Sequence, residues 1–219
     1  ARSGAEVNRW VTALDVDDRD AAAFAPRLKL KGAAVAASST GPVAGLLSAR
    51  GAAEGVWRSV TGAGAALSGV EGWGPISQDA ASAISARSIN LVRPAGGALA
   101  LWGARTLSTD PDWRFLPVRR LALEIEKSLI AGLGWTTFEP NDAALWRDVS
   151  NAVDDLLLGY WRDGALIGKT PAEAFFVRCD RSTTTATDVA EGVFRILIGI
   201  APVKPAEFTY LSVAAAAGR

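Results

Sequence analysis

Histidine and methionine are both absent from this 219-residue chain, and Cys179 is its only cysteine. The lack of histidine removes the commonest general base and the commonest metal ligand. A single cysteine excludes a disulfide within the chain and a zinc site built from thiolates. Any chemistry would have to rest on carboxylates, lysine, tyrosine or Cys179. Because the chain begins at Ala1 without an initiator methionine, we expect it to be a processed or truncated piece of a longer protein.

The chain also lacks an excess of charge of either sign. Its 23 basic and 23 acidic residues cancel, whereas nucleic-acid binding depends on clustered basic charge. Weak net repulsion between copies leaves self-association open. No apolar run reaches the roughly 18 residues of a membrane helix, and no signal peptide is visible. The composition therefore predicts a soluble, cytoplasmic protein with no nucleic-acid partner and no direct membrane insertion.

Helical and strand patterns alternate, which predicts an α/β or α+β fold with a mixed sheet flanked by helices. Apolar residues recurring every three or four positions predict helices over 38–57, 77–88, 117–134 and 142–164, and a short helix beginning at Pro171. Strands are predicted over 28–31, 89–94, 98–103, 135–138, 174–180, 193–200 and 206–213. A small helical run is expected before Pro26, and 181–192 is expected to be a polar loop.

Several finer predictions concern where these elements end and which face is buried. Asn141 is expected to cap its helix, with Asp142 in the first turn. Thr170 is expected to cap the short helix, with Glu173 reaching back to it. The strand at 89–94 is expected to stop at Pro94, and the apolar run 193–200 is typical of a strand in the middle of a sheet. One buried stripe is predicted along the long helix, formed by Leu145, Val149, Val153, Leu156 and Tyr160.

No group of residues converges into a recognisable active site. Gly62 and Gly64 begin a dinucleotide-loop pattern, but Leu67 occupies the position of the third glycine, so a flexible connector is favoured. Cys179 has no histidine partner, and a structural thiol is favoured over a nucleophile. The run CDRSTTT at 179–185 is explained by an anion site or by an ordinary loop, and the loop is favoured. We therefore predict no catalytic, cofactor-binding or metal-binding residues.

Two features point instead to assembly. The stretch ALWGARTLSTDPDWRFLPVRR, residues 100–120, combines two tryptophans with four arginines, and both residue types are enriched in interface cores. A tryptophan-rich internal core explains the tryptophans as well. The second feature is the strand pattern near the end of the chain, which must pair internally or be donated to another chain, because an unpaired apolar edge promotes aggregation.

A long ordered set of motifs resembles the C-terminal region of contractile tail sheath proteins of phages, R-type pyocins and extracellular injection systems. The set begins with GPVAGLLSARGAAEGVW and continues with INLVRPAGGALALWGARTLSTDPDWRFLPVRRL. It ends with FEPND, GYWRDGALIGKTPAEAFFVRCD and IGIAPVKPAEF, so that the resemblance covers about residues 27–213. It implies a division into a remnant or linker (1–26), the sheath inner domain (27–213) and a flexible tail (214–219).

The resemblance also implies a function. The chain would be a non-enzymatic sheath subunit that stacks in hexameric rings around an inner tube and contracts to drive that tube through a target envelope. Its partners would be neighbouring subunits, the inner tube, and baseplate and terminator proteins. It would assemble in the cytoplasm as part of a phage tail or tail-like particle, with release outside the cell left open. A sheath-like terminator or baseplate component remains an alternative, and a nucleotide- or phosphate-binding enzyme using the Gly62–Gly64 loop is a weaker one.

Two sets of residues are candidates for contacts between subunits. The strand available for exchange is formed by Glu207, Phe208, Thr209, Tyr210, Leu211, Ser212 and Val213. The salt bridges that could be remade between two packings involve Arg105, Arg114, Arg119, Arg120, Asp110 and Asp112.

Overall fold

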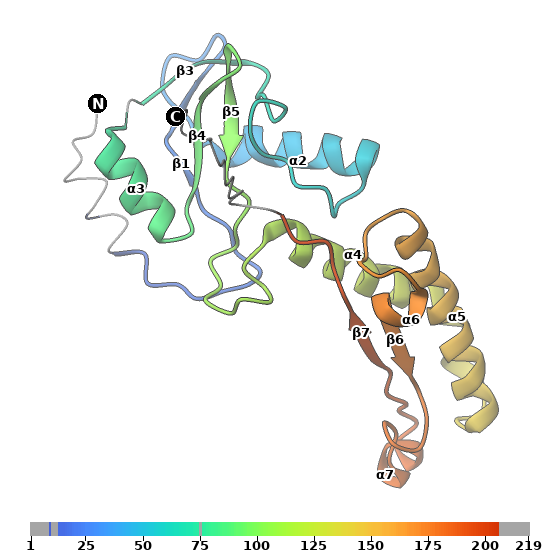
Figure 1. Ribbon diagram of the computed structural model, residues 1–219. Coiled ribbons are helices and arrows are strands. Elements are labelled where there is room, and N and C mark those ends of the chain that lie inside the picture. The colour runs from blue at the N-terminus through green and yellow to red at the C-terminus, as the bar shows by residue number, and fades with distance from the viewer. Residues whose placement is uncertain (1–8, 10–12, 75, 206–219) are drawn as a thin grey trace, which may run out of the picture.

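The computed structural model describes residue 9, residues 13–74 and residues 76–205. The candidate exchange strand, residues 207–213, lies outside these described residues. The molecule is elongated (Figure 1): a sheet region with helices on either side forms one end, and a long helix connects it to a second end made of helices and a projecting hairpin. Strands of both orientations occur. The predicted mixed α/β class is confirmed.

The largest sheet has the order β1-β4-β5. β1 (Phe24–Ala25) runs parallel to β4 (Asn90–Ala95), and β4 forms an antiparallel hairpin with β5 (Ala98–Trp102). The hairpin turn is Gly96-Gly97, with φ angles of 60° and 81° that favour glycine. The prediction that a helical run precedes Pro26 is wrong, because this segment supplies an edge strand.

The prediction that β4 stops at Pro94 is also wrong. Pro94 lies opposite Leu99, and the pairing continues to Ala95. β1 pairs only with the first two residues of β4. Pro94 therefore lies on an edge of the sheet, where its missing N–H removes no bond to a third strand.

A second, two-stranded sheet joins β2 (Leu28–Leu30) to β3 (Val70–Trp73). α2 (Thr40–Glu54) packs beside it, with Val43 fully buried as its apolar pattern predicts. The glycine-rich connector includes β3, and it also runs along β5. The Gly62 and Leu67 amides donate to the Leu101 and Leu99 carbonyls at 2.8 Å each.

α3 (Gln78–Ala86) covers the other face of the β1–β4 pair. It begins as predicted at Ser77, whose side chain accepts a hydrogen bond from the Ala80 amide. Ile84 from α3 packs with Ala25 and Leu91 of the two strands. The three-stranded sheet is thus covered by apolar clusters on both faces.

α4 (Leu116–Gly132) buries Val118, Leu121 and Ile125 at the predicted spacing. The next segment, 135–138, was predicted to be a strand, but it belongs to the 3-10 helix η1 (Gly134–Phe138). The Thr136 and Thr137 hydroxyls donate to the carbonyls three residues earlier, at 2.9 Å each. Such local bonds favour a tight turn over an extended strand.

α5 (Ala143–Arg162) is the longest helix. Asp142, not Asn141, is its N-cap: one Asp142 oxygen accepts hydrogen bonds from the Ala144 and Leu145 amides. The buried stripe continues from Val153 to Leu157, which is fully buried, whereas the predicted Leu156 is only half-buried. Leu157 joins α4, α5 and residues 165–179 in the core of this end of the molecule.

The projecting hairpin comes last. α6 (Pro171–Ala174) leads directly into β6 (Phe175–Arg178), α7 (Ala186–Ala190) lies at the far tip, and β7 (Leu197–Ile200) returns antiparallel to β6. The expected capping by Thr170 does not occur, and Glu173 instead accepts from the Lys169 amide at 2.8 Å. The prediction of a wholly polar loop over 181–192 is wrong because it contains α7.

Candidate interaction surfaces

The loop between β5 and α4, residues 103–115, is tied down by two buried polar side chains. Asn90 in β4 accepts a hydrogen bond from the Arg105 amide and donates to the Arg105 carbonyl, each at 2.8 Å, and it also donates to the Ala23 carbonyl at 3.1 Å. The fully buried Thr106 hydroxyl donates to the Trp113 carbonyl at 2.7 Å. Sequence reasoning missed both residues, because neither type signals such a role.

Gly103 is required by this arrangement. A Cβ at this position would lie 2.8 Å from the Asn90 side-chain oxygen, and so glycine allows the loop to approach β4 closely. The base of the loop is therefore fixed to the sheet. Its outer residues, including Asp110 and Asp112, remain exposed.

Residues 17–20 pack across the outside of this loop. Asp17 accepts hydrogen bonds from the Thr109 amide, at 3.0 Å, and from the Thr109 hydroxyl. Asp20 forms an ion pair with Arg119, and Arg19 and Arg119 both lie over the Trp113 ring, at 5.2 and 5.4 Å from its centre. These contacts lower the pKa of Asp17, through the Thr109 bonds, and the pKa of Asp20, through Arg119.

The six candidate salt-bridge residues have different roles within this chain. Arg119 pairs with Asp20, and Asp112 pairs with Lys204 at 3.2 Å. The half-buried Arg120 donates to the Leu47 carbonyl of α2 at 3.0 Å, and burial lowers its pKa. The remaining three candidates lie along the loop: Arg105 is fixed through its backbone by Asn90, Asp110 accepts from the Asp112 amide at 2.9 Å, and Arg114 is exposed.

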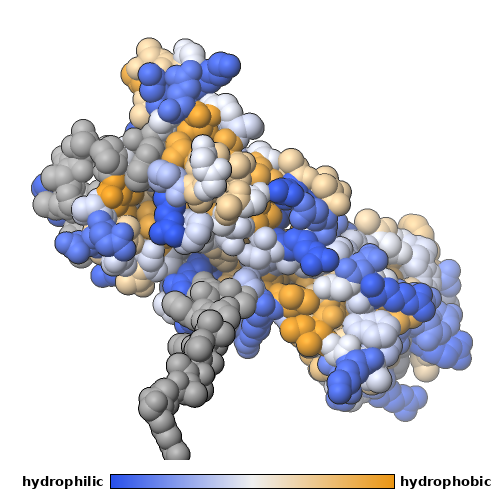
Figure 2. Space-filling view, turned by 45° about the horizontal axis from the view of Figure 1, so that its top comes forward, coloured by the Kyte–Doolittle hydropathy of each residue, from blue (hydrophilic) through white to orange (hydrophobic). Residues whose placement is uncertain are grey.

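The β6–β7 sheet has only two strands among the described residues. Val177, Ile198 and Ile200 pack against the core, while Phe176 and Leu197 are 51% and 49% exposed. Figure 2 shows apolar surface in the half of the molecule that holds α5 and this hairpin. The prediction that 193–200 forms a strand in the middle of a sheet is therefore wrong for the part of the chain that the structure describes, in which β7 pairs only with β6.

Gly199 shapes the exposed side of this sheet. A Cβ at Gly199 would lie 2.0 Å from the Phe176 ring, so the ring lies directly over the glycine of the neighbouring strand. The aromatic side chain thus covers the position where β7 has no side chain.

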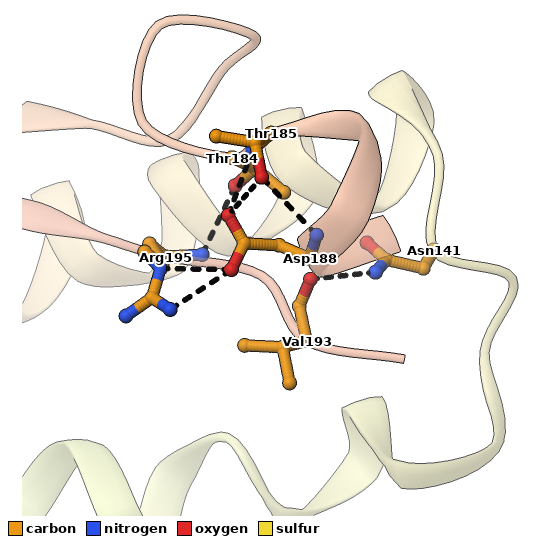
Figure 3. A network of polar contacts seen from close by, with 6 residues as sticks. All are labelled: Asn141, Thr184, Thr185, Asp188, Val193 and Arg195. Atoms are coloured by element: carbon orange, nitrogen blue, oxygen red, sulfur yellow. Dashed lines mark hydrogen bonds and ion pairs between the residues drawn. The ribbon is translucent and has the colours of Figure 1, made fainter. Parts of the chain in front are cut away.

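The tip of the hairpin is ordered by a polar network around Asp188 (Figure 3). Thr185 caps α7, accepting from the Asp188 amide at 3.2 Å while its own amide donates to Asp188 Oδ2 at 2.9 Å. Arg195 donates to Asp188 Oδ1 through Nε at 3.0 Å and Nη2 at 2.8 Å. The Arg195 and Thr185 hydrogen bonds hold the pKa of Asp188 far below its ordinary range.

Asn141 links this tip to α5. Its amide donates to the Val193 carbonyl at 2.8 Å, and its oxygen accepts from the Trp146 indole at 2.8 Å. The asparagine that the sequence suggested as a helix cap is therefore a tether between two elements. Thr187, Val189 and Glu191 on and beside α7 remain exposed.

The glycine loop and Cys179, which the sequence offered as possible binding or reactive groups, have structural roles. The Gly62 and Leu67 amides donate to β5 carbonyls, and the Gly64 carbonyl accepts from Arg50 at 2.6 Å, so these groups of the glycine loop already have partners. Cys179 is buried, and burial raises the pKa of its thiol. Among the described residues, no group of three or more acidic or cysteine side chains could hold a metal ion. Within the same part of the chain, none of the helices is long and apolar enough to cross a membrane.

Comparison with known proteins relates the chain to a family. Residues 108–216 match the family model of the phage tail sheath C-terminal domain. No curated protein matches the chain in sequence. Solved structures do: the sheath complex of an extracellular contractile injection system, PVC, in its contracted state is 28% identical, with a TM-score of 0.87 over 98% of this chain and 61% of that one.

Two further structures come from the anti-feeding prophage. Its contracted helical sheath is 28% identical, with a TM-score of 0.80 over 96% of this chain and 66% of that one. A chain in its baseplate is 27% identical, with a TM-score of 0.83 over 96% of this chain and 64% of that one. The present chain thus spans less than two thirds of the length of these relatives.

Proposed function

We propose that this chain, whose residues 108–216 belong to the phage tail sheath C-terminal domain family, is the inner part of a contractile sheath subunit. In this role it is a structural, non-enzymatic protein that stacks in hexameric rings around an inner tube and contracts to drive the tube through a target envelope. The observation that carries the proposal is the match of nearly the whole chain to a contracted sheath complex at a TM-score of 0.87.

The β6–β7 sheet supports assembly by strand exchange. One face of this sheet packs on the core through Val177, Ile198 and Ile200, and among the described residues its outer strand edges have no further strand beside them. Strands added by neighbouring subunits would pair these edges, because each added strand satisfies backbone groups and covers apolar side chains. The candidate strand Glu207–Val213 supplies such a donor, and the exposed Phe176 and Leu197 give the acceptor an apolar surface.

The α7 tip supports a contact with the inner tube. It is the part of the hairpin farthest from the rest of the molecule (Figure 1). The Asp188–Arg195 pair and the Asn141–Val193 bond fix its shape, while Val189 and Glu191 remain exposed. A rigid, exposed tip suits a contact that must transmit force.

Contraction requires two packings of the same rigid units. The exposed Asp112–Lys204 pair and the partly exposed Asp20–Arg119 pair are suited to exchange between partners, since surface ion pairs contribute little individually and are readily remade. Many identical subunits acting together multiply a small free-energy difference. Assembly takes place in the cytoplasm, and the product is a phage tail or tail-like particle.

A baseplate or terminator role is the second candidate, and the match to a chain of the anti-feeding prophage baseplate favours it. Both roles use the same fold and differ in whether the subunit polymerises along the tube. The length of the assembly that the protein forms therefore distinguishes the sheath role from the baseplate or terminator role.

Electron microscopy of the protein, expressed together with an inner tube protein, tests the proposal. Hollow striated tubes of uniform width are expected for a sheath, and single rings for a terminator or baseplate component. Particles that stay monomeric at high concentration would contradict both.

Two substitutions localise the contacts. Leu197→Asp should prevent tube formation while leaving the monomer folded, and Val35→Asp is the matched control, since Val35 is 75% exposed in the loop between β2 and α2. Glu191→Lys should reduce co-sedimentation with the inner tube without preventing contacts between sheath subunits. If both sites tolerate these changes, neither surface has its proposed role.

A further inference from the structure

A pocket of about 560 Å³ lies beside the sheet and the loop that follows it. Its apolar wall is formed by Ile89, Trp102 and Phe115, and its polar lining includes Thr61, Ser85 and Arg105. Trp102 is 42% exposed, and the guanidinium carbon of Arg93 lies 3.6 Å from the centre of its ring. The volume lies within the range of roughly 300–1,000 Å³ that is typical of ligand pockets, so the space is large enough for an aromatic side chain.

The chain that leaves the β6–β7 hairpin runs to this pocket. The Ala201 amide donates to the Ala174 carbonyl at 2.8 Å, and the Val203 amide donates to the Ala165 carbonyl at 3.1 Å. Lys204 then pairs with Asp112 on the loop after β5. Pro205, the last described residue, is itself part of the pocket lining. The described chain therefore ends at the pocket.

The sequence that follows matches the pocket chemically. Residues 206–213, AEFTYLSV, carry two aromatic side chains and one charge. Phe208 lies three residues beyond Pro205, a reach of about 10 Å for extended chain. The negative Glu207 is complementary in sign to Arg105, the charged residue of the lining.

We propose that residues 206–213 dock in this pocket of their own chain before assembly, with Phe208 against Trp102 and Phe115. This occupant is the segment that follows Pro205, a residue of the pocket lining, directly in the sequence. Docking within one chain requires no second subunit, and the short tether gives the segment an effective concentration in the millimolar range or above.

Docking has a consequence that rests on the proposed strand exchange. The same residues cannot lie in their own pocket and pair with the β6–β7 sheet of a neighbour. Self-docking therefore keeps the donor strand from pairing with other subunits at low protein concentration. The end of a growing sheath must displace the strand from its pocket. The pocket would slow spontaneous polymerisation without lowering the stability of the finished lattice.

Cysteine cross-linking tests the docking directly, since Cys179→Ser removes the only native thiol. In that background, Thr61→Cys combined with Thr209→Cys places one thiol in the pocket lining and one beside Phe208. Ser182→Cys combined with Thr209→Cys is the matched control, because Ser182 is exposed in the loop leading to α7 at the tip of the hairpin. After mild oxidation of dilute protein, we expect about tenfold more monomeric disulfide in the pocket pair than in the control, independent of protein concentration.

Trp102→Ala should reduce this cross-link strongly, while Trp102→Phe, which keeps an aromatic surface, should preserve most of it. Covalent dimers that increase with concentration, or equal yields in the pocket and control pairs, would overturn the proposal. Microscopy of the same oxidised and reduced samples separates it from the proposed function. A cis disulfide without tubes under any condition would contradict the sheath function alone, and tubes without a cis disulfide would contradict the docking alone.

Discussion

Arg119 Nε lies 2.5 Å from Asp20 Oδ1, joining residues that are 99 positions apart. Arg119 is largely buried, with 12% of its side chain exposed, whereas 51% of the Asp20 side chain is exposed. Together with the Asp17–Thr109 bonds, this pair attaches residues 17–20 to the loop between β5 and α4. Residues 17–20 are therefore fixed to the loop by contacts at both ends of the segment.

Asp20→Asn should lower the thermal unfolding temperature at low ionic strength and have less effect in high salt, because salt screens the attraction of an exposed partner. Thermal unfolding of both proteins across a salt series measures this. Asp15→Asn, at an exposed acid outside the contact, is the control. An equal loss at all salt concentrations would indicate that lost packing, and not charge, is responsible.

Acid sensitivity should depend on Asp188. Its pKa is lowered in the folded state by Arg195 and Thr185, and an aspartate in the unfolded chain has a pKa of about 3.9. The contribution to the free energy of unfolding is therefore complete above the unfolded pKa and is lost as pH falls through the folded pKa. Asp188→Asn should flatten the rise in stability with pH in the acid range, as measured by urea unfolding between about pH 2 and 6. A slope equal to that of the unmodified protein would contradict the assignment.

Two adjacent leucines of α5 provide a matched pair for the core. Leu157→Ala should cost about 2–5 kcal/mol of unfolding free energy, because the side chain is fully buried and the cavity cannot close. The half-buried Leu156→Ala should cost clearly less. Denaturant unfolding measures both, and equal costs would mean that the buried stripe does not run through Leu157.

Gly199→Ala should destabilise the hairpin by about 1–3 kcal/mol, since the new Cβ overlaps the Phe176 ring. Combining it with Phe176→Ala should recover most of that loss, because the obstructing ring is gone. Hydrogen exchange of the β6 and β7 amides measures the local effect. Additive losses in the double variant would place the strain elsewhere.

Asn90→Ala removes the side chain that bonds both the Arg105 amide and the Arg105 carbonyl, while the Ala23 carbonyl keeps its bond from the residue 90 amide. Each buried backbone group left unpaired costs about 1–3 kcal/mol, so this change should rank among the more damaging single substitutions in the sheet region. Asn151→Ala, on the exposed face of α5, is the control. A loss no greater than that of the control would show that water replaces the side chain.

The sequence by itself determined most of the alternation of helices and strands, the start of α3 after residue 77 and the helical periodicity of α2, α4 and α5. These features follow from local periodicity and turn chemistry, which operate over a few residues. Its ordered motifs also identified the sheath resemblance, which the family match to residues 108–216 confirms.

Only the tertiary structure decided which elements meet. The pairing of Phe24 with Asn90, the contact of Asp20 with Arg119 and the position of Pro205 at the pocket join residues far apart in the chain. The apolar run 193–200 is typical of a central strand, because a run of apolar residues indicates that a strand is covered. It does not indicate which residues cover the strand. Among the described residues β7 has a single neighbour, β6, and the packing of the rest of the chain, not the composition of the run, decided this.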